Sequence, residues 1–361
     1  MGSLPEQWQI QTGDEMDPSV TTTPASVTEW RDVDPRTFWE RIFPTHQPAV
    51  LRDVVRSWPA VAQGLESPQA LARYLLSTEQ GGPVSLLTAD PSIKGRFFYS
   101  DDMRGINFER RRAPLSAGLQ ALLMHLENQQ PPAIYIESAP LPECLPSFTK
   151  YHSLELLNPA IVPRIWIGNA VTVQTHYDYS SNLACVVAGR RRFTLFPPDQ
   201  LANLYVGPWD FTLAGVPVSM VRLEAPDFSR YPRFRIALSR AQVTELGPGD
   251  ALFIPYAWWH HVESLEPFNL LVNYWWHSGV GSPIGAAAGF DTLVHAIVSL
   301  RALPPATREA WRALFDYYVF GTRERVTEHI PEHRRGILGE LSATDIARLR
   351  THLVERLKSW K

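Results

Sequence analysis

The chain has few cysteines, few lysines and no long apolar run. Its two cysteines, Cys144 and Cys185, form neither a CxxC pair nor a disulfide framework, so we expect a reducing compartment such as the cytoplasm. No run of about 18 apolar residues occurs, so no membrane span is predicted. The N-terminus lacks the basic and apolar regions of a signal peptide. Lysine supplies only four of the 34 basic residues, and arginine supplies the rest.

The charge and size of the chain further limit the classes of protein to which it can belong. A net charge of −3 and a pI of about 6.4 provide no general basic surface, so no nucleic-acid partner is expected. With 361 residues, of which 45% are hydrophobic, the chain can bury a sizeable core. Its 31 prolines and 12 tryptophans favour a strand- and loop-rich domain with aromatic walls over a helical bundle.

In the first 160 residues, a polar segment that we predict to be disordered is followed by a mixture of predicted helices and strands. Residues 1–25 are polar and aperiodic, and we predict that they are disordered. Helical patterns follow, the first with Asp34 as its cap and Pro35 at its first position. The predicted helices are 34–43, 67–77 and 114–128, and the predicted strands are 48–55, 96–100 and 133–138.

Residues 160–277 change to short apolar runs separated by Gly and Pro, which is typical of a β-sandwich or barrel. The runs are IVPRIWIG, VTVQTHYD, LACVVAG, RRFTLFPP, VTELGPGDALFIP, HHVESL and NLLVNYWW. From about residue 284 the pattern becomes helical, over 284–302, 305–319 and 342–360. The last helix starts with the capping-box pattern Ser342-x-x-Asp345, and one face carries Ile346, Leu349, Leu353 and Leu357.

The pair His176-x-Asp178 is the first sign of chemistry. On a strand, residues two apart point to one face, so the imidazole and the carboxylate can hold one metal while Tyr177 points away. Alone, the pair is also compatible with a surface turn. The block Trp259-His260-His261-Val262 offers a third ligand from a returning strand, which would complete a facial triad with open positions on Fe(II). Alternation puts His260 and His261 on opposite faces, so either one, but not both, can be that ligand.

Three blocks carry a resemblance to a known family: HYDYSSNLACVVAGRRRFTLFPPDQ, GPGDALFIPYAWWHHVESL and LVNYWW. Together with WERIFPTHQPAVLRDVVRSWPAV, they resemble the cupin-like branch of the JmjC-type 2-oxoglutarate oxygenases. Within that family, they are most similar to the asparaginyl hydroxylase that inhibits hypoxia-inducible factor. The resemblance implies a mainly β fold with flanking helices: a cupin-like JmjC oxygenase domain over 26–280, whose double-stranded β-helix (jelly-roll) core spans about 160–277, and a helical extension over 281–361. It also implies Fe(II) bound by His176, Asp178 and His260, with His261 either supporting a metal ligand from behind or structural.

The resemblance further implies a 2-oxoglutarate site. Arg191 takes the place where the family member has Lys, with Arg190 and Arg192 as alternatives, and would anchor the distal carboxylate. Tyr135 matches a tyrosine that bonds the same carboxylate, and Asn182 and Asn273 match asparagines near the metal. The chain departs from the family at Val173, where a threonine is usual; Thr172 and Thr175 flank it.

The function that follows is hydroxylation of a protein side chain or a small molecule, with release of succinate and CO2. Three alternatives stay open: a JmjC-type N-demethylase, a cupin metalloenzyme that needs no 2-oxoglutarate, and a non-catalytic cupin binding protein.

Other segments of the chain have two interpretations each. The C-terminal helices predict a homodimer, or packing within the chain. The segment 98–115 predicts a substrate rim or a solvated loop. Five aromatic residues either line the substrate cleft or belong to the core: Trp258, Trp259, Tyr274, Trp275 and Trp276.

Overall fold

A computed structural model describes residues 24–79, 81–277 and 287–358. The chain divides into two units, the first ending at Trp276 and the second beginning at His277. The predicted disorder of 1–25 and the predicted boundary near 280 lie almost wholly outside the described residues. Among those that are described, no helix is long and apolar enough to cross a membrane.

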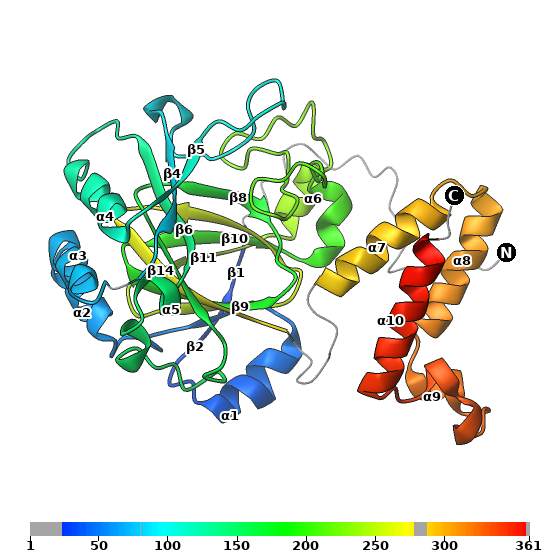
Figure 1. Ribbon diagram of the computed structural model, residues 1–361. Coiled ribbons are helices and arrows are strands. Elements are labelled where there is room, and N and C mark those ends of the chain that lie inside the picture. The colour runs from blue at the N-terminus through cyan, green and yellow to red at the C-terminus, as the bar shows by residue number, and fades with distance from the viewer. Residues whose placement is uncertain (1–23, 80, 278–286, 359–361) are drawn as a thin grey trace. The chain divides into compact units, whose positions relative to one another are not determined.

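Two sheets form the first unit (Figure 1). The five-stranded sheet has the order β1 (Ala25–Ser26), β11 (Gln242–Leu246), β10 (Arg191–Phe196), β13 (Trp259–Ser264) and β8 (Thr172–His176). The nine-stranded sheet has the order β2 (Thr28–Trp30), β3 (Ala49–Leu51), β12 (Ala251–Ile254), β9 (Ser181–Ala188), β14 (Asn269–Trp276), β7 (Pro163–Gly168), β6 (Ala133–Pro140), β4 (Val84–Ala89) and β5 (Glu109–Ala113).

The last eight strands build a double-stranded β-helix. Strands β8, β10, β11 and β13 lie in one sheet, and β7, β9, β12 and β14 lie in the other, so the chain passes between the sheets repeatedly. Alternate residues of facing strands, such as Val186, Phe193, Leu252 and Val262, form an apolar core shared by both sheets. The predicted jelly-roll fold is confirmed.

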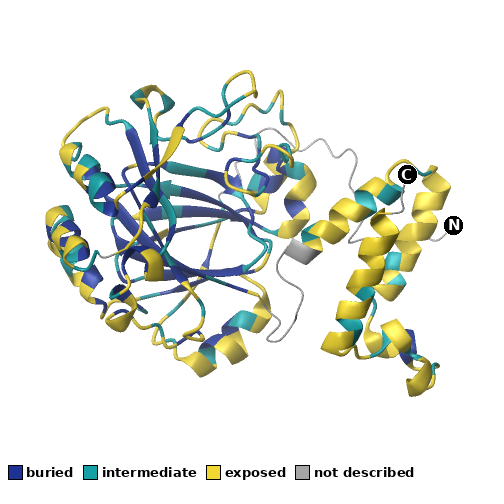
Figure 2. Ribbon diagram, viewed as in Figure 1, coloured by how far each residue is buried: buried dark blue, intermediate teal, exposed yellow. Residues whose placement is uncertain are grey.

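Helices pack on the nine-stranded sheet and enclose a second, larger core (Figure 2). They are α2 (Pro59–Glu66), α3 (Pro68–Ser77) and α4 (Leu115–Met124). Ser67 caps α3 through its hydroxyl, which accepts from the Ala70 amide. The predicted first helix is α1 (Pro35–Thr37), and Asp34 caps it as expected. It continues as a π-helix over Phe38–Ile42 and a 3₁₀ turn over Phe43–Thr45.

Two expectations for this unit change. Residues 96–100 were predicted as a strand, but they make only isolated bridges at Arg96 and Tyr99. Phe97 and Tyr99 alternate because they pack into an apolar cluster, not because they lie in a ladder. The segment 98–115 is not one loop, since β5 forms the sheet edge beside β4.

The connection from β10 to β11 carries a 3₁₀ segment (Pro198–Asn203) and α6 (Phe234–Ser239), and α5 (Leu141–Cys144) follows β6.

The second unit is helical, as predicted. Its helices are α7 (Ala287–Leu300), α8 (Pro305–Tyr318), α9 (Arg323–Thr327) and α10 (Ala343–Lys358). Ser342 and Asp345 form the predicted capping box, because each side chain bonds the other's backbone amide. Among the described residues of this unit, only Val326 and Thr327 are buried, and Figure 2 shows mainly exposed helices.

Candidate metal and cosubstrate site

Three side chains at one end of the β-helix form a potential metal site. His176 ends β8, Asp178 lies two residues further on, and His260 lies in β13 directly opposite His176. One ligand atom from each lies within 4.8 Å of the other two. The centroids of the two imidazole rings are 4.2 Å apart, and His260 Nε2 is 3.6 Å from Asp178 Oδ2. Two imidazoles and one carboxylate on one side of a point are the donor set of a facial triad.

Backbone contacts orient both imidazoles for metal binding. His176 Nδ1 lies 2.8 Å from the Gln174 carbonyl oxygen, and His260 Nδ1 lies 3.0 Å from the Trp258 carbonyl oxygen. A carbonyl only accepts, so each Nδ1 carries the proton and each Nε2 keeps its lone pair for a metal. Burial, aided by the neighbouring His176, lowers the pKa of His260 to about 4, so this ring is neutral at pH 7.

The carboxylate is held from the opposite sheet. Trp275 Nε1 donates to Asp178 Oδ2 over 3.1 Å. Asp178 therefore does not need to lie on β8, where the sequence placed it, because the indole of β14 fixes it beyond the strand end. Tyr177 points away into an apolar cluster with Trp259, as alternation requires.

His261 faces the other side of the five-stranded sheet. Its Nδ1 lies 3.2 Å from the Thr175 hydroxyl, and its Nε2 lies 3.6 Å from Glu224 Oε1. Burial alone would raise the pKa of Glu224, but the contact with His261, a backbone hydrogen bond and the charge of Arg96 together outweigh burial and lower that pKa to about 2. Of the two adjacent histidines, only His260 reaches the triad, and His261 ties the β10–β11 connection to the sheet.

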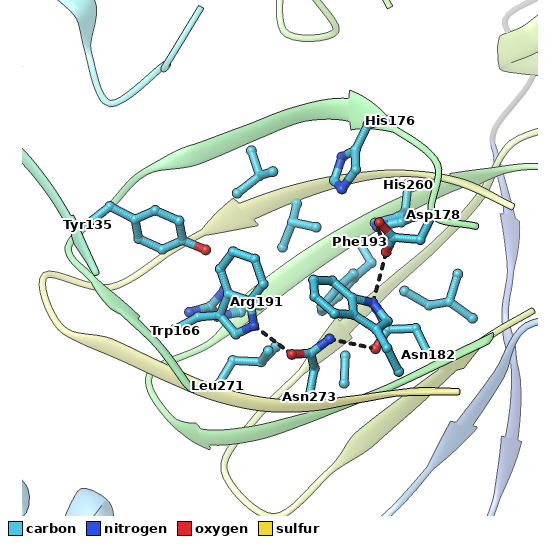
Figure 3. A pocket seen from close by; sticks show the side chains of 15 residues that line it. Tyr135, Trp166, His176, Asp178, Asn182, Arg191, Phe193, His260, Leu271 and Asn273 are labelled. Carbon is cyan, nitrogen blue, oxygen red and sulfur yellow. Dashed lines mark hydrogen bonds and ion pairs between the residues drawn. The ribbon is translucent and has the colours of Figure 1, made fainter. Parts of the chain in front are cut away.

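A cavity extends from the triad between the two sheets (Figure 3). All four residues predicted to hold 2-oxoglutarate line it, together with all three triad residues. The complete lining is Tyr135, Trp166, Val173, His176, Asp178, Asn182, Ala184, Arg191, Phe193, Ile254, His260, Val262, Leu271, Asn273 and Trp275. Apart from the polar groups discussed here, this lining is apolar.

Of the three consecutive arginines at 190–192, strand alternation turns only the middle one toward the cavity. Arg190 and Arg192 are largely exposed and pair with Glu266 and Glu245. Arg191 is 2% exposed and turns into the cavity. Its Nε and Nη2 have no hydrogen-bond partner in the described part of the chain. A buried guanidinium stays charged, so this orphaned cation fits an anionic ligand inside the cavity.

Tyr135 lies beside this cation. Its hydroxyl points toward Arg191 in Figure 3, while burial raises the pKa of the phenol and keeps it protonated. The ring lies across Gly168, where a Cβ would come within 2.6 Å of it. A glycine at this point of β7 is therefore what lets Tyr135 reach the cavity.

A chain of hydrogen bonds fixes the two asparagines. Trp166 Nε1 donates to Asn273 Oδ1 over 2.7 Å, and Asn273 Nδ2 donates to Asn182 Oδ1 over 3.1 Å. An indole N–H can only donate, so the order of both amides follows from it. Within the described part of the chain the Asn182 NH2 group has no acceptor, so it can donate to a ligand in the cavity. Sequence reasoning missed Trp166, although its place on the Arg164–Trp166–Gly168 face of β7 could have indicated it.

The remaining predictions for this site divide between cavity and core. Val173 lines the cavity, so an apolar side chain stands at the position where the resemblance leads one to expect a threonine, and Thr175 contacts His261 instead. Of the five aromatic residues considered for a substrate cleft, only Trp275 lines the cavity. The other four are buried in the apolar cores: Trp258, Trp259, Tyr274 and Trp276.

Comparison with known proteins adds a family and several relatives. The family model described as "Cupin-like domain" matches residues 35–281. Lysine-specific demethylase JMJ31 of Arabidopsis thaliana is 39% identical over 37% of this chain and 23% of its own length. tRNA wybutosine-synthesizing protein 5 of Danio rerio is 26% identical over 78% of this chain and 87% of its own length. The human bifunctional peptidase and (3S)-lysyl hydroxylase JMJD7 is 28% identical over 64% of this chain and 77% of its own length. The chain thus spans less than a quarter of the length of the first of these relatives.

Proposed function

The chain belongs to the cupin-like domain family, and from this premise we propose that it is an Fe(II)- and 2-oxoglutarate-dependent oxygenase. The observation that carries the proposal is the buried Arg191 guanidinium, two of whose nitrogens lack a partner among the described residues, in the same cavity as His176, Asp178 and His260. The five-stranded sheet thus presents to one cavity both a facial triad, through β8 and β13, and a buried cation that needs an anion, through β10. A dicarboxylate that also chelates the metal satisfies both.

Each polar residue then has a defined task. His176, Asp178 and His260 would hold iron, which supplies the activation of dioxygen when bound. Arg191 and Tyr135 would bind the distal carboxylate of 2-oxoglutarate, and the Asn182 amide would donate to its other end. The overall reaction converts a substrate C–H, dioxygen and 2-oxoglutarate into C–OH, succinate and CO2. The apolar walls Val173, Val262 and Leu271 would keep water from competing.

Hydroxylation and N-demethylation remain the two reactions to separate. Both insert oxygen into a C–H, and an N-methyl group hydroxylated in this way then releases formaldehyde. The names of the relatives include a demethylase and a lysyl hydroxylase, so they support either reaction. We favour hydroxylation, on the likeness to the asparaginyl hydroxylase. A cupin that needs no 2-oxoglutarate would not explain why Arg191 is buried with no acidic partner among the described residues.

The test is succinate release from 2-oxoglutarate by the purified protein with Fe(II) and dioxygen. The adjacent histidines provide a matched pair of variants. His260→Ala should lose bound metal and turnover, whereas His261→Gln should keep both, because its side chain contacts Thr175 and Glu224 instead. Absence of succinate with an iron-loaded protein would refute the proposal and favour a binding protein.

We also propose that two copies of the chain associate through the second unit. Its helices expose large apolar side chains, among them Val298, Phe320, Leu353 and Leu357. A helical unit of this size with two buried side chains among its described residues lacks a core of its own. A second copy would supply the matching apolar faces by two-fold symmetry.

A further inference from the structure

Arg164 lies on the cavity face of β7, close to the metal end. It pairs with Asn273 of β14, which pairs in turn with Ala184 of β9. Side chains of directly paired residues point to one face of a sheet. Because Asn273 and Ala184 line the cavity, Arg164 projects on the same side. It is the second residue of β7 and is not part of the cavity lining, so it lies at the edge of the cavity.

The guanidinium is held in place from two sides. Its Nη1 donates to the carbonyl oxygen and the hydroxyl of Ser138, over 2.8 and 3.1 Å. Its central carbon lies 5.7 Å from the ring centroid of Trp275, the residue that bonds Asp178. Arg164 is thus separated from a predicted metal ligand by the width of one indole.

The backbone of Ser138 is unusual in a way that serves this contact. Ser138 has φ = +46°, in the left-handed region, and lies where the pairing of β6 with β7 shifts register. A non-glycine residue in this conformation is strained, and such bulges often redirect groups beside functional sites. Here the bulge turns both oxygens of Ser138 toward Arg164.

Among the described residues, no acidic side chain neutralises this arginine. Arg110, Arg190 and Arg192 each pair with a glutamate, whereas Arg164 makes no ion pair with any acidic group that the structure describes. Only Nη1 of its three nitrogens has a protein acceptor in the same part of the chain. A half-buried, immobilised cation with free donors beside the metal end is suited to recognising an oxyanion.

We propose that Arg164 is the substrate-recognition residue and that the substrate carries a carboxylate or phosphate group near the carbon that is oxidised. The inference rests on the proposed oxygenase function, because it assigns Arg164 to the second substrate and Arg191 to 2-oxoglutarate. The Trp275 face would bear the substrate chain between the oxyanion and the metal. Neutral or basic compounds would then be poor substrates.

The test uses the full chain labelled with 5-fluorotryptophan and loaded with Zn(II) and saturating 2-oxoglutarate, so that the Arg191 site is filled. Fluorine NMR follows Trp275, whose signal is assigned by its loss in Trp275→Phe. Acetate and inorganic phosphate are the probes. In the wild type, millimolar concentrations of one of them should shift this signal, and the stronger probe indicates which oxyanion the substrate carries.

Arg164→Gln should weaken that binding about tenfold or more, the range for a hydrogen bond to a charged group. Arg164→Lys should restore part of it, and Arg192→Gln should match the wild type. The proposal is overturned if neither probe shifts Trp275, or if Arg164→Gln responds like the wild type. Succinate release by the same wild-type preparation with Fe(II) is scored separately, so a failed oxygenase function is distinguishable from a failed anion site.

Discussion

Removing the buried charge of Arg191 should have opposite effects on the protein with and without 2-oxoglutarate. In the protein alone, the guanidinium is 2% exposed and two of its nitrogens have no partner in the described structure. Replacing a buried ion pair with apolar groups of similar volume is often neutral or stabilises by about 1–4 kcal/mol, and a buried charge without a counter-charge destabilises the fold more than a pair does. Arg191→Met should therefore raise the melting temperature of the protein without cosubstrate by about 2 °C or more.

The same substitution should remove the stabilisation by cosubstrate. A ligand at a hundred times its Kd stabilises the native state by about 2.7 kcal/mol. With Mn(II) present, 2-oxoglutarate should raise the melting temperature of the wild type and leave Arg191→Met unchanged. Differential scanning calorimetry measures both effects. Arg192→Met is the control, because that side chain is 42% exposed, so its loss should cost little and spare the cosubstrate response. The reasoning fails if Arg191→Met is destabilised without cosubstrate, or if 2-oxoglutarate still stabilises it.

Three further predictions follow from contacts in the two units. Trp166→Phe keeps the ring but removes the donor that orders both asparagine amides, so the Kd for 2-oxoglutarate by calorimetry should rise about fivefold to tenfold; an unchanged Kd would mean that the amides are ordered otherwise. The folded-state pKa of Glu224 is depressed to about 2, so its stabilising effect is present above its ordinary value of 4.5 and is lost as the pH falls toward 2. Glu224→Gln should therefore flatten the loss of stability across this pH window in urea titrations, and an unaltered acid slope would contradict it. Leu353→Glu with Leu357→Glu should halve the light-scattering mass from twice 40.8 kDa to one protomer; a wild type that already measures 40.8 kDa would refute the dimer.

Local patterns predicted much of the fold, where the period of the pattern leaves little choice. Strand alternation separated His260 from His261 and turned one arginine of three inward, because adjacent strand residues must face opposite sides. The caps at Asp34 and Ser342 were predictable, since a short polar side chain before a helix satisfies its free amides. The strand predicted over 96–100 was wrong for a related reason. Alternation indicates that one side of a segment is buried, but it does not indicate whether a partner strand pairs with that segment.

The parts of the site that depend on strand order could not be predicted. Trp166 acts on Asn273 only because β7 and β14 are neighbours, although more than a hundred residues separate them in sequence. Arg164 and Ser138 meet through a bulge whose position no local pattern specifies. Asp178 was expected on the strand, but an indole from another sheet holds it beyond the strand end.

The pair His260-His261 divides β13 between two tasks that can change independently. One ring belongs to the chemistry, and the other anchors the long β10–β11 connection through Glu224. Substitutions and insertions in that connection can therefore accumulate without altering the metal ligands, provided that the glutamate remains. A one-residue shift within β13 would exchange the two rings and abolish both tasks at once, so this short strand should tolerate no insertion while the connection beside it tolerates many.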